Sequence, residues 1–498
     1  MNWVRDMRSY PAGFGKSKAT KPIVIIGGGF SGAVLALHLR RKSSAAEIVV
    51  IEPHADIGRG LAYTTTDPAH RINVPATRMI LDEDDAEHFH RWLIATGYLA
   101  TDRIAAMADG RLFPTREAFG RYVNAQVRSL SPAVTHLRSK AVNASKTEDG
   151  YRISCDNGET IDAATLVLAT CHAPPAMPAS LRSLRSHPRF FSDPWSGNAL
   201  SSLAPNDRIL IVGTGLTMAD IVVSLDRAGH RGKISAISRR GLRPQSHTDS
   251  MSVFEGDFTT PPVTQALALC RLVRKAVHDA ARDGLPWQIV LNRVHEQGQP
   301  IWQNLSASAR RQLLRHLRPY WDTHRFRIAP QVHERIERLI AYGMLDIRSA
   351  SVRAGYEALD IRASSARTNP APRTITVDLR ARHSTEWKPE TFDAVMLATG
   401  PAHAVTADPL LSSMNMHGLL QADALGLGIA VDRSGRVINH RNRPDPHLFV
   451  MGRVARGTFG ELMGVSDISA YATNIAEQIA ASTRAVDHCA HPASEDAC

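Results

Sequence analysis

The stretch Gly27-Gly28-Gly29-Phe30-Ser31-Gly32 follows the apolar run 21–26 (KPIVII) and leads into the segment 31–41 (SGAVLALHLRR). A second apolar run, 47–51 (EIVVI), comes next and ends at Glu52. The apolar spacing of 31–41 is typical of a buried helix, so the order is strand, glycine turn, helix and strand. This order predicts a parallel, right-handed βαβ unit that binds a dinucleotide.

Each glycine of this turn has an expected task. Gly27 permits the tight bend, Gly29 lets a pyrophosphate approach the backbone, and Gly32 lets the helix pack on the strand. Glu52 stands where an acid accepts hydrogen bonds from ribose hydroxyls, which a purely structural glycine turn would not explain. The residues predicted to hold this first dinucleotide are Gly27, Gly29, Phe30, Ser31, Gly32, Glu52 and Tyr63.

The pattern recurs at 213–220 (GTGLTMAD), between a strand at 208–212 and a helix at 216–228. Met218 takes the third glycine's place, and the next strand, 233–237, ends in Ser238-Arg239-Arg240 without an acid. Guanidinium groups suit a 2′-phosphate, which favours NADPH over NADH, although a solvated basic pair is an alternative. The predicted contacts of this second dinucleotide are Gly213, Gly215, Thr217, Arg239 and Arg240.

The two units end alike, in the buried strands 166–170 (LVLAT) and 395–400 (VMLATG), each after a strand-rich excursion. The fold class predicted from this pseudo-repeat is α/β, with two Rossmann-like dinucleotide-binding domains, strand-rich excursions and a helical insertion. An acid in the first unit suits FAD, whose adenosine ribose carries no phosphate, and arginines in the second suit NADPH.

The predicted domains follow this division of the chain. They are a tail at 1–20, a discontinuous FAD-binding domain at 21–200 and 385–485, an NADPH-binding domain at 201–262 and 344–384, a helical substrate or lid insertion at 263–343, and a tail at 486–498.

Candidate substrate and flavin contacts lie outside the two turns. Tyr63 and Asn73 follow a Gly-Arg-Gly loop (58–60) that can run along the cofactor toward the isoalloxazine, although an ordinary surface loop is an alternative. The catalytic candidates are His324, Arg325 and Arg327 in the insertion, together with Asn73. The strand at 448–452 precedes a helix at 466–481 whose positive end could face the flavin pyrimidine.

Composition excludes several classes of protein. The net charge of +11 is spread along the chain, which disfavours nucleic-acid binding and allows attraction of anionic small molecules. The five cysteines are odd in number and two lie in the last ten residues, which disfavours a disulfide framework and indicates a reducing, cytoplasmic setting. None forms a Cys-x-x-Cys pair, which disfavours a dithiol reductase. No metal-ligand spacing occurs, and no apolar run approaches the ~20 residues that cross a bilayer.

These motifs resemble the two-dinucleotide flavoprotein superfamily, in particular its flavin-containing and N-hydroxylating monooxygenase branch. GRGLAYTTTDPAHRINVPATRM (58–79), RHLRPYWDTHRFRIAP (315–330) and GRVARGTFGEL (452–462) are similar to a bacterial FAD/NAD(P)-binding family that includes a flavoprotein urate hydroxylase. The resemblance implies FAD on the first turn and NADPH on the second. Arg453 stands where the superfamily often has a ribityl-binding acid, so that role is unassigned.

The leading hypothesis is a cytoplasmic monooxygenase in which NADPH reduces FAD and the reduced flavin transfers one atom of O2 to a small polar or anionic substrate. The resemblance makes urate, converted to 5-hydroxyisourate in purine metabolism, the first candidate, and amino-acid N-hydroxylation the second. A flavin reductase or electron transferase acting on a protein partner is the alternative of another class. The sequence leaves the oligomeric state open.

Overall fold

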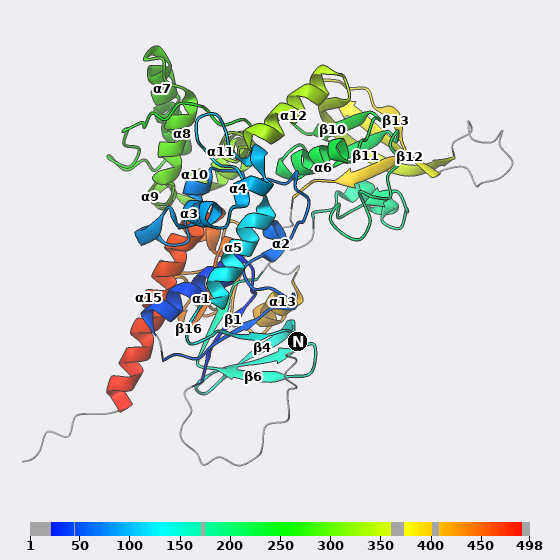
Figure 1. Ribbon diagram of the computed structural model, residues 1–498. Helices are drawn as coiled ribbons and strands as arrows, with labels where there is room; N and C mark the ends of the chain where they lie inside the picture. Colours follow the sequence, from blue (N-terminus) through cyan, green and yellow to red (C-terminus); the bar gives the residue numbers. More distant parts are fainter. Residues whose placement is uncertain (1–20, 44, 171–174, 360–372, 401–407, 491–498) are drawn as a thin grey trace, which may run out of the picture.

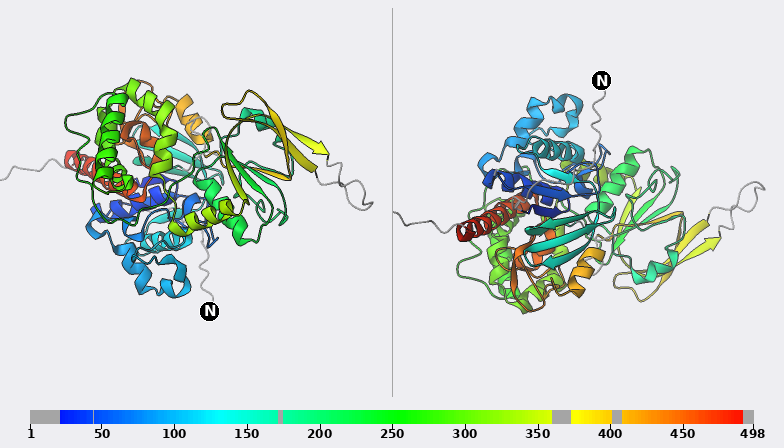
Figure 2. Two further views of the ribbon diagram at one scale, coloured as in Figure 1. Left: turned by 90° about the horizontal axis from the view of Figure 1, so that it is seen from above. Right: turned by 90° about the horizontal axis from the view of Figure 1, so that it is seen from below.

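The protein is described from a computed structural model that covers residues 21–43, 45–170, 175–359, 373–400 and 408–490. In these residues two large sheets stand apart, and a group of helices lies beside both (Figure 1). The first sheet lies in the lower part of the view, the second at the upper right, and the helical group at the upper left. Figure 2 shows the same separation from above and below.

The first sheet has a parallel centre with one antiparallel edge strand. Its apolar strands are buried on both faces, which is typical of a parallel sheet covered by helices. In spatial order the strands are β15 (Arg436–Ile438), β16 (Pro444–Val450), β7 (Thr165–Leu168), β1 (Ile23–Ile26), β2 (Ile48–Ile51) and β3 (Thr135–Leu137). The main covering helices are α1 (Phe30–Lys42), α5 (Arg116–Arg128) and α15 (Val465–Ala490).

The second sheet is parallel from β11 to β8 and continues as an antiparallel hairpin ladder. In spatial order its strands are β13 (Lys388–Phe392), β12 (Arg373–Ala381), β11 (Leu345–Leu359), β10 (Ile234–Ser238), β9 (Ile209–Val212), β14 (Ala394–Leu397) and β8 (Phe190–Phe191). Two helices, α6 (Leu216–Arg227) and α12 (Pro330–Ala341), share a core with it. The antiparallel sheet of β4 (Ala141–Thr147), β5 (Gly150–Cys155) and β6 (Thr160–Ala163) is the excursion of the first unit.

The predicted fold class and pseudo-repeat are confirmed. In the first sheet the closing strand β7 lies beside β1, and in the second the closing strand β14 lies beside β9. Strand pairing nevertheless crosses two of the predicted domain boundaries. The strands β8, β13 and β14 belong to the second sheet, although the ranges 21–200 and 385–485 had placed them in the first domain.

The predicted insertion is helical, as expected, but its last helix has another task. Helix α12 packs on α6 and β11, so it is the crossover helix that connects β10 to the parallel strand β11. The helices before it share a separate core. They are α7 (Ala266–Arg282), α8 (Trp287–Glu296), α9 (Gly298–Asn304), α10 (Ala307–Gln312), a π-helical turn (Leu313–Leu317) and α11 (Arg318–Arg325).

Short helices complete the described residues. The α-helical ones are α2 (Gly60–Tyr63), α3 (His88–Ala95), α4 (Tyr98–Thr101), α13 (Pro409–Met416) and α14 (Arg456–Phe459). The 3₁₀ turns are Ala76–Arg78, Glu83–Asp85, Arg103–Ala105, Ala179–Leu184 and Arg453–Ala455.

Candidate cofactor and substrate site

The first glycine turn joins β1 to α1 at the carboxyl edge of the first sheet. Gly27 has φ +105°, and a Cβ there would lie 2.3 Å from the Ala169 carbonyl oxygen. A Cβ on Gly32 would lie 1.9 Å from the Gly27 carbonyl oxygen, so neither position accepts a side chain. At Gly29, the N-cap of α1, a Cβ would meet only the Gly60 Cα, at 3.5 Å. The turn therefore leaves backbone open at the positive end of a helix, which suits a pyrophosphate.

Glu52 follows β2 and is 8% exposed. Its Oε2 accepts a hydrogen bond from the Gly28 N–H at 2.8 Å, and its Oε1 accepts one from the His54 N–H at 3.1 Å. The carboxylate thus lies beside the turn, as the ribose role requires, and also joins the turn to β2. Its contact with a ribose remains a prediction.

Of the aromatic candidates of the first turn, Phe30 belongs to the core and Tyr63 is partly buried against it. Phe30 and Tyr63 both pack on Phe119, with ring centroids 5.7 and 4.8 Å away. Burial raises the pKa of Tyr63 to about 12, so its hydroxyl stays protonated. The preceding loop does reach the turn, because the Gly58 N–H donates to the Gly28 carbonyl at 2.7 Å.

The C-terminal segment begins beside this turn. Gly452 follows β16 with φ +79°, and a Cβ there would lie 2.5 Å from the Ser31 Oγ. The chain then runs through 453–464 to α15, whose first turn holds Asp467. Ser31 and Gly452 therefore border the region where the turn would present a flavin.

The second glycine turn repeats the first in backbone geometry. Gly213 has φ +122°, and its Cβ would lie 2.1 Å from the Ala398 carbonyl oxygen. Gly215 is the N-cap of α6, and a Cβ there would meet nothing within 4 Å. Thr217 is half-buried in the first turn of α6, and Met218 is fully buried in the second core.

The two predicted phosphate-binding arginines differ. Arg239 is exposed just beyond β10, where a 2′-phosphate would lie if the second turn held NADPH. Arg240 is half-buried, and its guanidinium lies 4.7 Å from the centroid of the Tyr320 ring in α11. The structure therefore separates an exposed arginine from one that packs against the insertion.

Two of the insertion candidates hold the insertion together. Arg327 is 7% exposed, donates to Asn292 Oδ1 at 2.9 Å and stacks 5.3 Å from the Trp287 ring. Burial lowers its pKa to about 10. His324 packs edge-on against Trp287 at 4.9 Å and hydrogen-bonds to the Tyr320 carbonyl.

Arg325, by contrast, reaches the C-terminal segment in a group that we call the junction cluster, formed by His295, Arg325, Glu461 and Asp467. His295 Nδ1 lies 3.0 Å from Glu461 Oε2, and its Nε2 lies 3.4 Å from Asp467 Oδ1. Arg325 Nε donates to Glu461 Oε2 at 3.3 Å, and the Trp321 Nε1–H donates to the same carboxylate. Trp302 adds a hydrogen bond from Nε1 to the Gly457 carbonyl at 3.0 Å.

The junction cluster is half-buried, since its four side chains are 15–23% exposed, and its charges are coupled. Burial lowers the pKa of His295, but Asp467 and Glu461 outweigh it and raise the pKa above its usual value. Burial alone would raise the pKa values of the two carboxyls, yet hydrogen bonding to His295 and the charge of Arg325 lower both. The sequence interpretation missed His295 and Asp467, and it quoted Glu461 only as part of a motif.

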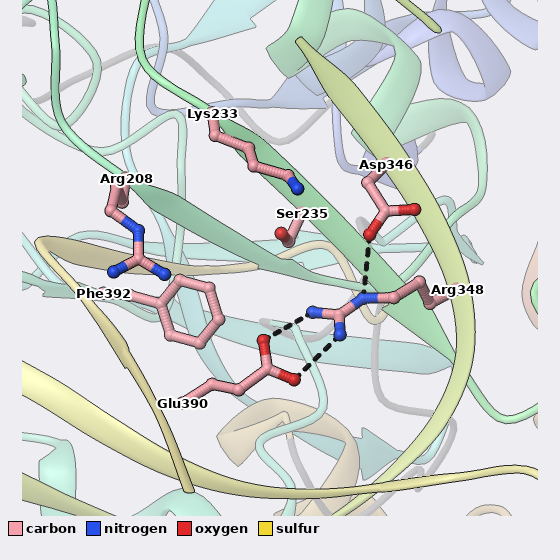
Figure 3. A pocket seen from close by; sticks show the side chains of 7 residues that line it. All are labelled: Arg208, Lys233, Ser235, Asp346, Arg348, Glu390 and Phe392. Atoms are coloured by element: carbon pink, nitrogen blue, oxygen red, sulfur yellow. Dashed lines mark hydrogen bonds and ion pairs between the residues drawn. The ribbon is translucent and has the colours of Figure 1, made fainter. Parts of the chain in front are cut away.

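A small cavity lies at the opposite edge of the second sheet, away from the glycine turn (Figure 3). Its volume is about 70 Å³, far below the several hundred Å³ of a cofactor site. Arg348 spans it and donates two hydrogen bonds of 2.8 Å to Glu390. The remaining lining residues are Arg208, Lys233, Ser235, Asp346 and Phe392.

Across the described ranges, no cluster of three or more His, Cys, Asp or Glu side chains is arranged to bind a metal ion. No helix in the same ranges combines the length and apolarity of a membrane span.

The comparisons with known proteins agree with this fold. Residues 24–173 match a family model described as FAD-NAD(P)-binding. This matched stretch contains the first glycine turn and Glu52. The comparison with curated protein sequences gave no match.

Solved structures resemble the chain over nearly its whole length. One is an ornithine N-hydroxylase of Kutzneria sp. 744, solved with reduced FAD, NADP+ and L-ornithine. Its TM-score is 0.64 at 17% identity, and the match covers 93% of this chain and 100% of the hydroxylase. L-lysine 6-monooxygenase from Pseudomonas syringae has a TM-score of 0.63 at 18% identity, with 94% and 100% coverage. A bacillithiol disulfide reductase from Bacillus cereus has a TM-score of 0.51 at 13% identity, with 93% and 100% coverage. The chain therefore has the fold of the two-dinucleotide flavoproteins, and the prediction of FAD and NADPH as cofactors agrees with the matched family model.

Proposed function

We propose that the protein is an FAD-dependent, NADPH-using monooxygenase that N-hydroxylates a small amine, with an amino acid as the first candidate. The observation that carries this proposal is the arrangement of two nucleotide-binding turns and a helical insertion on a fold that spans an entire ornithine N-hydroxylase. The amino-acid alternative raised by the sequence is thus favoured over urate, which no comparison supports.

The reaction has a simple balance. One oxygen atom of O2 enters the new N–O bond and the other leaves as water, while NADPH supplies two electrons. Bound FAD supplies the redox chemistry and the reaction with O2. The residues of this chain would bind the two cofactors on the turns around Gly29 and Gly215 and orient the amine, and the insertion would exclude water.

The test begins with the visible spectrum of the purified protein, which should show bound flavin. NADPH oxidation should then rise on adding ornithine, lysine or related amines, and ¹⁸O from ¹⁸O2 should appear in a hydroxylamine product. Urate serves as the comparison substrate. If NADPH oxidation responds to no amine but rises with a low-molecular-weight disulfide or a redox protein, the protein is a reductase and the proposal is wrong.

A further inference from the structure

Helix α6 has an apolar face and a polar face, and the polar face is buried at Asp220 and Ser224 but exposed at Arg227. Its apolar side chains, such as Ile221 and Val222, lie in the core of the second unit. Asp220, Ser224 and Arg227 are spaced i, i+4 and i+7, so they form a polar stripe along another face of the helix. All three contact residues of the first unit, so this stripe forms part of the interface between the two nucleotide-binding units, and we call this part the seam.

The strongest contact of the seam is an ion pair. Arg116, the first residue of α5, donates to both carboxylate oxygens of Asp220, with distances of 2.7 and 3.0 Å. The two side chains are only 16% and 9% exposed. A bidentate, buried guanidinium–carboxylate pair sets orientation as well as distance.

A second set of hydrogen bonds continues the seam. The Ser224 hydroxyl donates to Asp67 Oδ2 at 2.7 Å, so its oxygen accepts from His70 Nε2 at 2.8 Å. Arg227 Nε donates to Asp67 Oδ1 at 3.0 Å. Burial lowers the pKa of His70, which keeps the imidazole neutral for this arrangement. The seam is therefore a satisfied network rather than a loose polar interface.

The seam also reaches a predicted flavin contact. Arg116 donates to Asn73 Oδ1 at 3.4 Å, and His247 Nε2 hydrogen-bonds to the Asn73 carbonyl at 2.7 Å. His247 belongs to the chain that leaves the second sheet after β10. A single hydrogen-bonded path thus runs from α6 through the first unit and back to the second.

We propose that Arg116, Asp220 and Ser224 are positioning residues that set the nicotinamide against the flavin, a role that rests on the two cofactors of the proposed function. Asp220 lies one turn from Gly215, the N-cap at which the second dinucleotide would sit. Anchoring this turn to the first unit fixes where the positive end of α6 points. Hydride transfer depends steeply on such placement, since a shift of about 1 Å can cost ~10²-fold in rate.

The test uses the full-length, flavin-loaded protein under anaerobic conditions, with Arg116→Gln and Asp220→Asn. The rate constant for flavin reduction by NADPH should fall about 10²-fold, whereas the Kd of NADPH should change much less. Arg116→Lys keeps the positive charge but loses the two parallel hydrogen bonds of the guanidinium. Its rate constant for flavin reduction should therefore lie between those of wild type and Arg116→Gln. Ser224→Ala removes the centre of the stripe without leaving a buried charge, and it should give a smaller loss in the same direction.

Two readouts are independent of turnover. Adding NADP+ to the chemically reduced wild-type protein is expected to give a long-wavelength charge-transfer absorbance, and this absorbance should be weaker in the variants. Amide hydrogen exchange in 216–227 should become faster. Arg338→Gln is the matched control, because Arg338 pairs at 2.8 Å with Asp226 on the same helix but within the second unit. It should leave both readouts and the reduction rate unchanged.

Flavin reduction at the wild-type rate in folded Arg116→Gln and Ser224→Ala would overturn the inference, as would equal losses in Arg338→Gln. These outcomes are distinct from failure of the proposed function. A wild-type protein that is reduced by NADPH but forms no hydroxylamine would refute N-hydroxylation and leave the seam's role intact.

Discussion

The two glycine turns have the same backbone geometry but differ in the side chains that lie beside them, at the end of the second strand of each unit. In both, the first glycine has positive φ and faces the carbonyl of a closing strand, Ala169 in one and Ala398 in the other. In the first, the Glu52 carboxylate accepts the Gly28 N–H. In the second, the Thr214 and Ser238 hydroxyls share a hydrogen bond of 2.8 Å, and Arg239 stands exposed beyond it.

This comparison teaches that the backbone of the turn and its choice of nucleotide are separable. The glycines are required by contacts within the protein, at Ala169 and Ala398, whether or not a ligand is bound. The residue after the second strand, Glu52 in one unit and Arg239 in the other, determines which nucleotide is preferred. A carboxylate there suits ribose hydroxyls and repels a 2′-phosphate. Substitutions at the two kinds of position should therefore have different consequences.

The largest effect is expected for Gly27→Ala and Gly213→Ala. Each new Cβ would overlap a backbone carbonyl that no side-chain rotation can move, at an unfavourable positive φ, for a cost of at least about 4 kcal/mol. Gly27→Ala should abolish flavin uptake, whereas Gly213→Ala should keep flavin and lose reduction by NADPH. Flavin absorbance and anaerobic reduction measure the two losses.

Gly215→Ala is the matched control, because its Cβ would meet nothing within 4 Å of protein. It should fold with wild-type flavin content and weaken only NADPH. Loss of flavin in both Gly213→Ala and Gly215→Ala would show that the two units are not separable.

Glu52→Gln should have the next largest effect. It weakens a charged hydrogen bond to the Gly28 amide and the predicted one to the ribose, so FAD affinity should fall by about 2–3 kcal/mol, roughly 10²-fold. Flavin titration of the apoprotein measures the Kd. Ser238→Ala, the corresponding change in the second unit, should leave that Kd unchanged, and a loss there would contradict the division between the turns.

Arg239→Ala should weaken NADPH by about 10- to 30-fold, since an exposed charged contact is worth roughly 1.5–2 kcal/mol, and should leave NADH nearly unchanged. Arg240→Ala should change the preference for NADPH over NADH less than Arg239→Ala does, because the Arg240 guanidinium stacks on Tyr320. The ratio of KM values for NADPH and NADH measures both. Equal losses for the two nucleotides would show that neither arginine contacts the 2′-phosphate.

The smallest effect concerns the junction cluster and pH. The raised pKa of His295 contributes stability below about pH 6.5, which is lost as pH rises through the folded-state pKa. The lowered pKa values of Glu461 and Asp467 contribute stability above their usual values of 4.5 and 3.8, which is lost as pH falls through the folded-state values. The junction cluster therefore contributes most to folding stability between the usual pKa values of the carboxyls and about pH 6.5.

His295→Gln should cost about 1–2 kcal/mol at pH 6, and the difference from wild type should shrink as pH rises. Thermal unfolding between pH 5 and 9 measures it. His324→Gln, in the same insertion but outside the cluster, should show no such convergence with pH. A difference for His295→Gln that stays constant over this range would contradict the charge assignment.

Local pattern was sufficient to predict most of the fold. The apolar runs before Gly27 and Gly213 and the matching closing strands define both βαβ units, because strand burial and glycine geometry are local properties. The domain boundaries were less accessible, since the pairing of β8 and β14 within the second sheet depends on distant residues. The sequence places helix α12 in the predicted insertion, because its apolar face does not show whether it packs in the core of the insertion or in that of the second sheet.

The site was predicted less completely than the fold. Gly27, Gly213 and Glu52 carry signals in the sequence, but the partner of Arg325 is 136 residues away in Glu461. Phe30 and Tyr63 are predicted cofactor contacts, a role that stays a prediction, and the structure adds that both rings pack on Phe119. The polar stripe of α6 could have been found, because Asp220, Ser224 and Arg227 share one face of an otherwise apolar helix.

The position of the insertion within the second unit has one more consequence. Both of its attachment points, after β10 and before α12, belong to the second unit. Its far side touches Gly457 and Glu461 of the other unit. Evolution can therefore exchange this helical module for one of another shape without disturbing either glycine turn. Proteins that share the two turns but act on unrelated compounds are expected to differ most in this stretch.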